Sequence, residues 1–416
     1  MNQRRVFQDA QEFLTREQLP GWLIHDYRDS NPIFRQVVTP SGHVTRPCLL
    51  YIPARGIPTL LVHHVDAGKF APQNGEPDST PNMELAIYRN RQTMVESLRQ
   101  VLSGAAMVAM EYSPNYELPR VSRVDAGTVE LVRSLGPKVV SSADLMQFAT
   151  QRWTSEQLAG HQRAAEILGQ IVNQAFQHIG ARLSEGHDPL SPSLPRGDAR
   201  GVPTEFEIAE FIRRRFAEEG LEAADGPIVS VNAHCSDPHY EPIPEGSSVF
   251  QPGDWVLIDL WAKENRPNSV YADITWVAYV GDQVPERHQT IFDIVIGARD
   301  AALNYLQESF QQGLTVRGWQ ADQVAREYIE ARGYGEFFTH RLGHSISYEV
   351  HGEAVNLDGF ETHDTRRIIP GIGFSIEPGI YLPEFGVRSE IDAYMSEAGP
   401  YASSPVQREV VLIPAG

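Results

Sequence analysis

Five residues in the last third of the chain are candidate metal ligands, because their types and order suit a pair of divalent ions. They are Asp259, Asp273, His344, Glu377 and Glu390, in the segments LIDL, YADITW, HRLGHS, SIEPGIY and GVRSEI. Carboxylates bind divalent cations and can bridge two of them, and an imidazole completes such a set. Two neighbouring metal ions can activate a shared water molecule and polarise a carbonyl. The pattern therefore predicts metal-assisted hydrolysis.

Asp259 and Asp273 each lie in an apolar run that is typical of a strand. An aspartate inside WVLIDLWA is costly to bury unless it is paired or bound to a metal ion. The connecting segment KENRPNS is long enough to turn, so the two carboxylates can face each other across a hairpin. The alternative is that one aspartate caps a turn and the other is solvated, and each residue taken singly leaves that alternative open.

Three histidines cluster around the predicted histidine ligand. His340, His344 and His351 all fall within HRLGHSISYEVHG. If residues 345–350 form a strand, His344 and His351 point to opposite faces unless the strand twists or bulges. One histidine could then bind a metal ion while another meets the substrate. A single histidine is more often structural, but three this close together favour a functional site.

The last two carboxylates have different local settings. Glu377 precedes Pro378 and Gly379, where a turn can project the carboxylate into a site. Glu390 follows Arg388 by two residues, so both side chains would face the same side of one strand. The alternative for the second pair is an exposed ion pair, which stabilises a protein only weakly.

The elements that must position these residues are predicted to form two domains, because 416 residues exceed the usual size of one. Residues 1–150 indicate a mixed α/β domain, with two strands in 49–65 around an Arg-Gly-Ile-Pro turn and a helix over 82–102. The catalytic domain is predicted over 154–416.

Capping patterns mark the first helices of the second domain. Thr154 and Gln157 form one predicted capping box, and Thr204 and Glu207 form another. The Pro-, Gly- and Ser-rich segment 186–203 between these helices predicts a loop.

Further along, the order of helix, helix and strands occurs twice, which indicates a pseudo-symmetric fold. The second round consists of helices over 286–310 and 319–332, then the strand-like segments HSISYEVH, GFSIEPGIYL and GVRSEIDAY.

Composition argues against several classes of partner. The formal net charge is −19 and the isoelectric point is about 5.2, which disfavours binding to nucleic acid or to anionic membranes. The two cysteines, Cys48 and Cys235, form no disulfide framework and favour a reducing compartment. We find no signal peptide and no apolar run long enough to span a bilayer. A cytoplasmic enzyme is expected.

Taken together, these segments resemble the pita-bread metallopeptidase family, which includes methionine aminopeptidase, aminopeptidase P and Xaa-Pro dipeptidase (prolidase). The resemblance is closest to the proline-specific members and covers residues 154–416. Residues 1–150 are similar to the creatinase/prolidase N-terminal domain in segments such as DYRDSNPIF. The resemblance implies an α/β (α+β) pita-bread fold and a homodimer. It also implies two divalent metal ions per subunit, with Mn²⁺ expected and Co²⁺, Zn²⁺ or Fe²⁺ possible.

The resemblance also implies a role for each metal ligand. Asp259 and Asp273 would bind one metal ion, with Asp273 bridging. His344 and Glu377 would bind the other ion, and Glu390 would bridge. Glu377 would in addition take a proton from the attacking water and pass it towards the leaving amine.

Other matching positions would meet the substrate or support the site. His239, in DPHYEP, would help to place the substrate, and His351 would donate to the scissile carbonyl oxygen. Tyr381 and Arg388 would steady the metal ligands.

Three departures from the family pattern leave every ligand in place. The spacing from Asp259 to Asp273 is three residues longer than is common, and the hairpin turn can accommodate an insertion of this length without disturbing either ligand. Trp276 stands where aminopeptidase P often has arginine, and Ser347 stands where glycine is frequent.

The resulting hypothesis is an enzyme that cleaves the bond before proline in Xaa-Pro dipeptides. A dipeptidase must recognise a free carboxylate near the proline, and Arg341 or Arg388 could bind it. An Xaa-Pro aminopeptidase for longer peptides is the main alternative. A creatinase-like amidinohydrolase, a metal-dependent lyase and a catalytically silent peptide-binding module also use this fold. The intact ligand set counts against the creatinase-like enzyme and the silent module.

Overall fold

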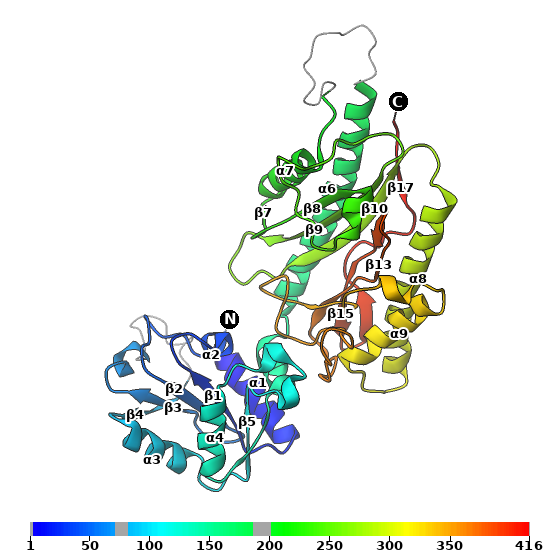
Figure 1. Ribbon diagram of the computed structural model, residues 1–416. Helices are drawn as coiled ribbons and strands as arrows, with labels where there is room; N and C mark the ends of the chain where they lie inside the picture. Colours follow the sequence, from blue (N-terminus) through cyan, green and yellow to red (C-terminus); the bar gives the residue numbers. More distant parts are fainter. Residues whose placement is uncertain (1–2, 71–81, 186–200, 416) are drawn as a thin grey trace. The chain divides into compact units, whose positions relative to one another are not determined.

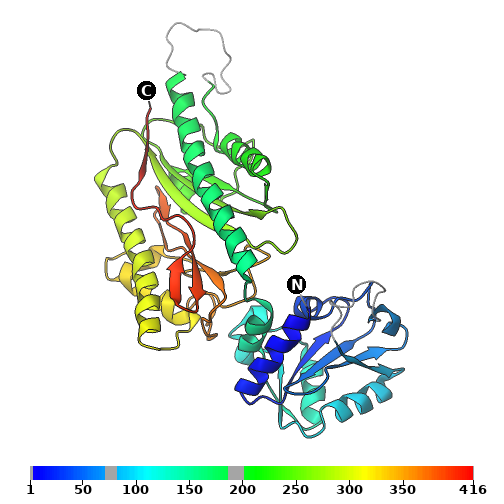
Figure 2. The same cartoon turned by 180° about the vertical axis from the view of Figure 1, so that it is seen from behind.

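The computed structural model describes residues 3–70, 82–185 and 201–415. The chain divides into two compact units, Met1–Arg152 and Trp153–Gly416. Figures 1 and 2 show both units from opposite sides. None of the helices in the described ranges combines the length and the apolar character needed to cross a membrane.

The first unit is built on a mixed six-stranded sheet with the order β4-β3-β2-β1-β5-β6. Its strands β1, β2 and β3 pair antiparallel, whereas β4, β5 and β6 pair parallel with their neighbours. Helix α1 packs against β1 and β2, and α3 packs against β3 and β4. The elements are α1 (Gln3–Arg16), β1 (Gly21–Asp26), α2 (Pro32–Val37), β2 (Cys48–Pro53), β3 (Thr59–His63), β4 (Glu84–Tyr88), α3 (Arg91–Val101), β5 (Met107–Met110), α4 (Ala126–Ser134), β6 (Lys138–Ser141) and α5 (Ala143–Thr150).

The helix predicted over 82–102 is only half correct. Its first part is the edge strand β4, and the helix α3 begins at Arg91. Asn90 lies two residues after the end of the strand and caps the helix, because its side chain accepts from Thr93 N while Thr93 Oγ1 accepts from Asn90 N. The apolar residues Leu85 and Ile87 alternate as a strand requires, a period hidden inside the longer helical pattern.

The second unit combines four long helices with short and long strands. A sheet runs in the order β17-β10-β9-β7, with β8 also paired to β9, and a second sheet runs β11-β12-β15-β16. Strands β13 and β14 form a separate ribbon. The elements are α6 (Ser155–Glu185), α7 (Glu205–Glu218), β7 (Leu221–Glu222), β8 (Ile228–Val231), β9 (Trp255–Glu264), β10 (Ala272–Val280), α8 (Glu286–Gln311), α9 (Gly318–Glu330), β11 (Ser345–Ile346), β12 (Gly373–Ile376), β13 (Gly379–Tyr381), β14 (Gly386–Arg388), β15 (Ile391–Ser396), β16 (Gly399–Ala402) and β17 (Val411–Ile413).

The helices of this unit begin where the sequence predicts. Thr154 Oγ1 accepts from Gln157 N, and the Gln157 side chain accepts from Thr154 N, so α6 has its capping box. Thr204 and Glu207 form the second box at the start of α7. Most of the predicted loop over 186–203 lies outside the described residues.

The hairpin of β9 and β10 separates two hydrophobic clusters. Side chains on one face, such as Ile258 and Ile274, pack with α6 and α7. Side chains on the other face, such as Leu257 and Val277, pack with α8 and α9. Figure 2 shows the long helix α6 lying across the first of these faces. The two-residue period of a strand therefore decides which half of the unit each side chain meets.

Candidate metal centre

The two aspartates lie on the same face of the hairpin. Asp259 is paired with Thr275, and Asp273 is paired with Trp261, in the antiparallel register of β9 and β10. The two carboxylates are therefore diagonal neighbours rather than directly opposed. Both are buried, at 8% and 4% exposure, on the face that holds Leu257 and packs towards α8 and α9.

Three predicted ligands come together at this face. Ligand atoms of Asp273, His344 and Glu390 all lie within 4.8 Å of one another, and all three residues are buried. His344 Nε2 also lies 3.4 Å from Glu377 Oε1 and 3.7 Å from Asp273 Oδ2. The chain thus brings residues that are up to 117 positions apart in the sequence (273 and 390) into one cluster.

Asp259 has a different closest partner. Its Oδ2 accepts from the Arg388 guanidinium at 2.5 Å. Arg388 also donates to Thr275 Oγ1 and to the Tyr381 hydroxyl, both at 3.1 Å. The fifth ligand candidate therefore stands at the edge of the cluster, next to a buried cation.

The donor set fits divalent metal ions. Within the described residues, Asp259 Oδ1, Asp273 Oδ1 and Glu390 Oε1 are buried and have no hydrogen-bond partner. Buried polar atoms are rarely left unpaired, and an exception in a native site needs a cause such as an ion. Carboxylate oxygens with one imidazole suit Mn²⁺ and related cations.

The pKa values of the carboxylates also reflect the crowding of buried acidic groups at this site. Burial, followed by the neighbouring charge of Asp259, raises the pKa of Asp273 well above its ordinary value. Burial, followed by the charge of Asp273, does the same to the pKa of Glu390. Burial raises the pKa of Glu377 to about 7. Carboxylates placed this close together in a dry site need positive charge to remain ionised.

Glu377 and Glu390 each lie at a break between two strands. The single strands predicted over GFSIEPGIYL and GVRSEIDAY are therefore wrong, because each is divided in two. The chain leaves β12 at Ile376, and Glu377 precedes Pro378 and strand β13. It leaves β14 at Arg388, and Glu390 precedes β15, which belongs to another sheet. Arg388 and Glu390 are buried, at 3% and 1% exposure, so the alternative of an exposed ion pair is wrong.

A sharp reversal of the chain brings two histidines together. Only Ser345–Ile346 is strand, so the predicted strand over 345–350 is mostly absent. Gly352 N donates to Ser345 O at 2.7 Å, which folds the chain back on itself. The rings of His344 and His351 consequently meet edge to face, with centroids 4.4 Å apart. His351 is exposed, whereas His344 is buried.

The remaining predicted residues lie at varying distances from the cluster. Tyr381 accepts from Arg388 and is linked to His340 Nε2 at 2.7 Å. Arg341 pairs with Glu361 at 3.1 Å. His239 is exposed on the loop after the 3₁₀ helix Asn232–Ser236.

Three supporting residues were missed in the sequence. Thr275 bridges Arg388 and Glu390, because its hydroxyl accepts from the first and donates to the second at 2.8 Å. Ser375 Oγ accepts from His344 N and donates to Glu377 Oε1 at 3.1 Å. Asp392 Oδ2 accepts from Asp273 N at 2.9 Å. Each stands two residues from a predicted ligand, so strand periodicity could have singled them out.

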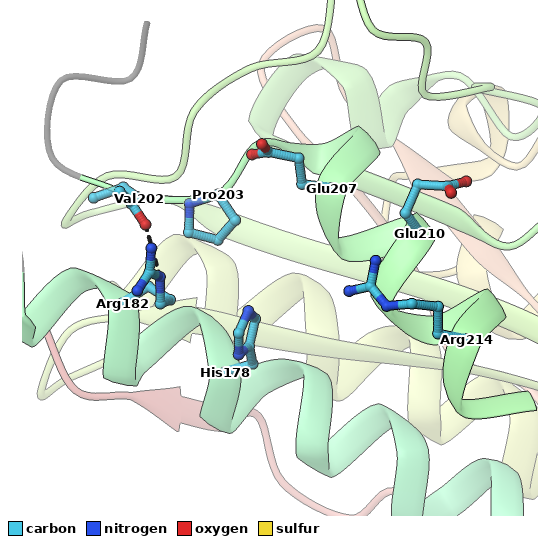
Figure 3. Close-up of a pocket in the computed structure, with 8 residues that line it drawn as sticks. His178, Arg182, Val202, Pro203, Glu207, Glu210 and Arg214 are labelled. Atoms are coloured by element: carbon cyan, nitrogen blue, oxygen red, sulfur yellow. Dashed lines mark hydrogen bonds between the residues drawn. The ribbon is translucent and has the colours of Figure 1, made fainter. Parts of the chain in front are cut away.

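A separate pocket lies between α6 and α7 and holds none of the predicted ligands. It has a volume of about 380 Å³ and carries two arginines, two glutamates and a histidine. Figure 3 shows His178 and Arg182 on α6 facing Glu207, Glu210 and Arg214 on α7. Among the described residues, the group of potential metal ligands is the one around Asp273 and not one in this pocket.

The family of the chain follows from its central and C-terminal sequence. Residues 159–397 match the model of metallopeptidase family M24. The chain belongs to that family. An M24 protein is expected to use divalent metal ions, and the cluster around Asp273 offers a site for them.

Curated relatives of this M24 protein include an Xaa-Pro dipeptidase and a probable dipeptidase. It is 33% identical over 262 residues to an Xaa-Pro dipeptidase of Pyrococcus furiosus, across 62% of this chain and 64% of the relative. It is 28% identical over 241 residues to a probable dipeptidase, PepE, of Mycobacterium tuberculosis, across 58% and 59% of the two chains. The chain therefore spans less than two thirds of the length of these relatives.

Solved structures show the shared fold over nearly the whole chain. Dipeptidase PepE of Mycobacterium ulcerans superposes with a TM-score of 0.67 at 22% identity, covering 99% of this chain and 98% of the other. An Xaa-Pro dipeptidase of Bacillus anthracis superposes with a TM-score of 0.60 at 19% identity, covering 99% and 100%. The predicted pita-bread fold is confirmed.

Proposed function

We propose that this M24 protein hydrolyses the peptide bond before proline in Xaa-Pro dipeptides, using two divalent metal ions. The observation that carries the proposal is the gathering of Asp273, His344, Glu377 and Glu390 around unpaired, buried carboxylate oxygens. The proline specificity is supported by the name of the Pyrococcus furiosus relative.

Each metal ion would be held by the residues that the family resemblance assigns. Asp259 and Asp273 would hold one ion, and His344 and Glu377 the other, with Asp273 and Glu390 shared between them. Metal ions at such a site lower the pKa of a water molecule and polarise the scissile carbonyl. The oxygen-rich set supports Mn²⁺, while Co²⁺, Zn²⁺ and Fe²⁺ remain chemically compatible.

Protein side chains would supply proton transfer and substrate contacts. Glu377 Oε1 is held by the Ser375 hydroxyl, which orients the carboxylate to accept a proton and return it to the leaving amine. His351, beside His344 and exposed, would donate to the carbonyl oxygen. His239 would contact the peptide, and Tyr381 would hold Arg388 against Asp259.

The aminopeptidase alternative is supported by the fact that both arginines that could bind a dipeptide carboxylate are already paired within the protein. Arg388 already donates to Asp259, and Arg341 already pairs with Glu361. A clamp for a dipeptide carboxylate would therefore require one of them to exchange partners. A longer peptide would need no such exchange.

The wider setting of the enzyme is part of the same proposal. Residues 1–150 would form the creatinase/prolidase-like domain, and 154–416 the catalytic domain. A homodimer rests on the family resemblance. A cytoplasmic location is supported by the free, buried thiols of Cys48 and Cys235.

The deciding experiment compares Leu-Pro with Leu-Pro-Ala, using protein stripped of metal and reloaded with Mn²⁺. Cleavage of the dipeptide alone is the expected result. Cleavage of the tripeptide would establish the aminopeptidase instead. If neither is cleaved by protein that holds two metal ions, the substrate is not an Xaa-Pro peptide.

An Arg341→Ala variant refines the result. If Arg341 binds the substrate carboxylate, KM for Leu-Pro rises while the metal content stays constant. An unchanged KM would mean that Arg341 only supports the chain through Glu361.

A further inference from the structure

The loop that carries His239 is tied at both ends to one buried carboxylate. Glu205 is the first residue of α7, and its side chain has 0% exposure. Its Oε1 accepts from Val231 N at 2.8 Å, and its Oε2 accepts from Ser248 N at 2.7 Å. These two amides flank residues 232–247, which we name the His239 loop. Glu205 therefore closes the base of this loop.

Two side chains of the His239 loop bind the same carboxylate. His234 Nδ1 lies 2.9 Å from Glu205 Oε1, and the Tyr240 hydroxyl donates to Oε2 at 2.7 Å. The rings of His234 and Tyr240 stack with centroids 4.5 Å apart. Two backbone amides, an imidazole N–H and a hydroxyl thus converge on one group. An ionised carboxylate has acceptor positions for all four, and such bonds are stronger than neutral ones.

In the chain, His239 lies between one residue that is bound to this anchor and another that is bound to Arg388 of the candidate metal centre. Its neighbour Tyr240 is bound to Glu205, and its other neighbour, Pro238, accepts from Arg388 at 3.5 Å. His239 N donates to Asp237 Oδ1 at 2.9 Å. The backbone of His239 is thus restrained on both sides, while its side chain is exposed and able to meet a peptide.

We propose that Glu205 is a positioning residue that holds the His239 loop in the conformation in which the His239 side chain can contact the substrate. This proposal rests on the proposed function, because the contact of His239 with a peptide substrate is part of that function. Removing the carboxylate would release His234, Tyr240 and both ends of the loop together. His239 would then sample many positions, and the loss of orientation would slow the reaction.

Glu205 lies in the first turn of α7, so its substitution could affect the start of this helix as well as the loop. A control variant in the same turn separates the two effects. Glu207 already caps this helix, accepting from Thr204 N at 2.8 Å, and within the described part of the chain its carboxylate bonds only to Thr204, not to the His239 loop. Glu207→Gln therefore changes the same turn of α7 without touching the loop. It is the matched control for Glu205→Gln.

The first measurement is hydrogen–deuterium exchange in metal-loaded protein without substrate. Glu205→Gln keeps the size of the side chain but turns one acceptor oxygen into an NH₂ donor, which faces other donors. Exchange over residues 232–247 is expected to be faster in Glu205→Gln and unchanged in Glu207→Gln. Unchanged exchange in Glu205→Gln would overturn the proposal.

The second measurement is a double-mutant cycle with His239→Ala, using Leu-Pro as the substrate. Glu205→Gln alone is expected to lower kcat/KM about tenfold or more at unchanged metal content. In the His239→Ala background the same change should have little further effect, because both act through one side chain. Losses that multiply in the double variant would mean that Glu205 acts independently of His239, against the proposal.

Tyr240→Phe covers the case in which Glu205→Gln fails to fold. This variant keeps the ring that stacks on His234 and removes only one bond to Glu205. It should show the same effects at smaller size, including the lack of additivity with His239→Ala, and full additivity would contradict the proposal. If wild-type protein cleaves no Xaa-Pro peptide, the proposed function fails, while exchange still decides whether Glu205 anchors the loop.

Discussion

Arg388 places a buried positive charge directly on the candidate ligand Asp259, with 2.5 Å between the guanidinium nitrogen and the carboxylate oxygen. Thr275 and Tyr381 fix the guanidinium from two further directions. Burial alone would lower the pKa of Arg388, but Tyr381, Asp259 and Glu377 outweigh that effect and raise it. The arginine is therefore a permanent part of the charge balance at this site.

Arg388→Lys should impair the enzyme although it conserves the charge. A lysine ammonium cannot reproduce the planar fork that binds Asp259, Thr275 and Tyr381 together. We expect kcat/KM for Leu-Pro to fall about tenfold or more. Steady-state kinetics at saturating Mn²⁺ would measure the loss. Arg408→Lys, in an exposed pair with Asp300, is the control and should retain activity. An Arg388→Lys enzyme as active as wild type would show that the fork is unimportant.

Asp273→Asn should separate stability from metal binding. In metal-free protein the substitution removes a charge that is buried beside Asp259 and Glu390, so Tm should stay constant or rise. Added Mn²⁺ should raise the Tm of wild type by mass action, but not that of the variant. Hydrolysis should be abolished.

Thermal unfolding with and without Mn²⁺ checks both halves of this prediction for Asp273, and elemental analysis checks metal content. Asp282→Asn, at an exposed position, serves as control. Retention of full activity and metal by Asp273→Asn, or by Glu377→Ala, would refute the proposed metal site.

His351→Ala should lower kcat while the metal ions stay bound. The ring of His351 touches that of His344 but lies on the exposed side of the chain reversal. Losing a donor to the carbonyl oxygen typically costs about a hundredfold or more in kcat. The test pairs kinetics with elemental analysis of the same sample. Loss of metal from His351→Ala would identify His351 as a ligand instead.

The buried Glu111 in the first unit should make the stability of that unit depend on pH. Burial raises its pKa from an ordinary value of 4.5 to about 7, despite bonds from Trp22, Ser142 and Asn31. Between these two values the folded protein holds a proton that the unfolded chain has released. The free energy of unfolding therefore falls as pH rises through this window, by an amount on the order of 3 kcal/mol.

Glu111→Gln should flatten this dependence between pH 4.5 and 7.5, whatever its effect on absolute stability. Hydrogen exchange in β1 and β5 of metal-loaded protein, measured across the pH range, reports the unfolding of the first unit. Glu117→Gln, at an exposed site, should keep the wild-type slope. An equal slope in Glu111→Gln and wild type would show that Glu111 is ionised in the fold throughout.

Several features of this protein could be predicted from local sequence because local chemistry decides them. The capping boxes at Thr154 and Thr204 form within one helical turn, so four residues suffice to specify them. Asp259 and Asp273 stand out because a carboxylate inside an apolar strand needs a partner. The family, and with it the fold, followed from five such short segments.

The geometry of the site depended on contacts between segments far apart in the chain. His351 reaches His344 only because Gly352 folds back onto Ser345, where strand periodicity alone would have separated the rings. Arg388 turns to Asp259 rather than to Glu390 because the strand ends between them.

By itself, then, the sequence indicated which side chains are candidate metal ligands and which segments carry them, since residue type and spacing are local properties. Only the tertiary structure decided that Asp273, His344 and Glu390 meet, that Thr275 and Ser375 support them, and that Glu205 holds the His239 loop. These relationships depend on how sheets and helices pack, and packing joins residues that no sequence window contains.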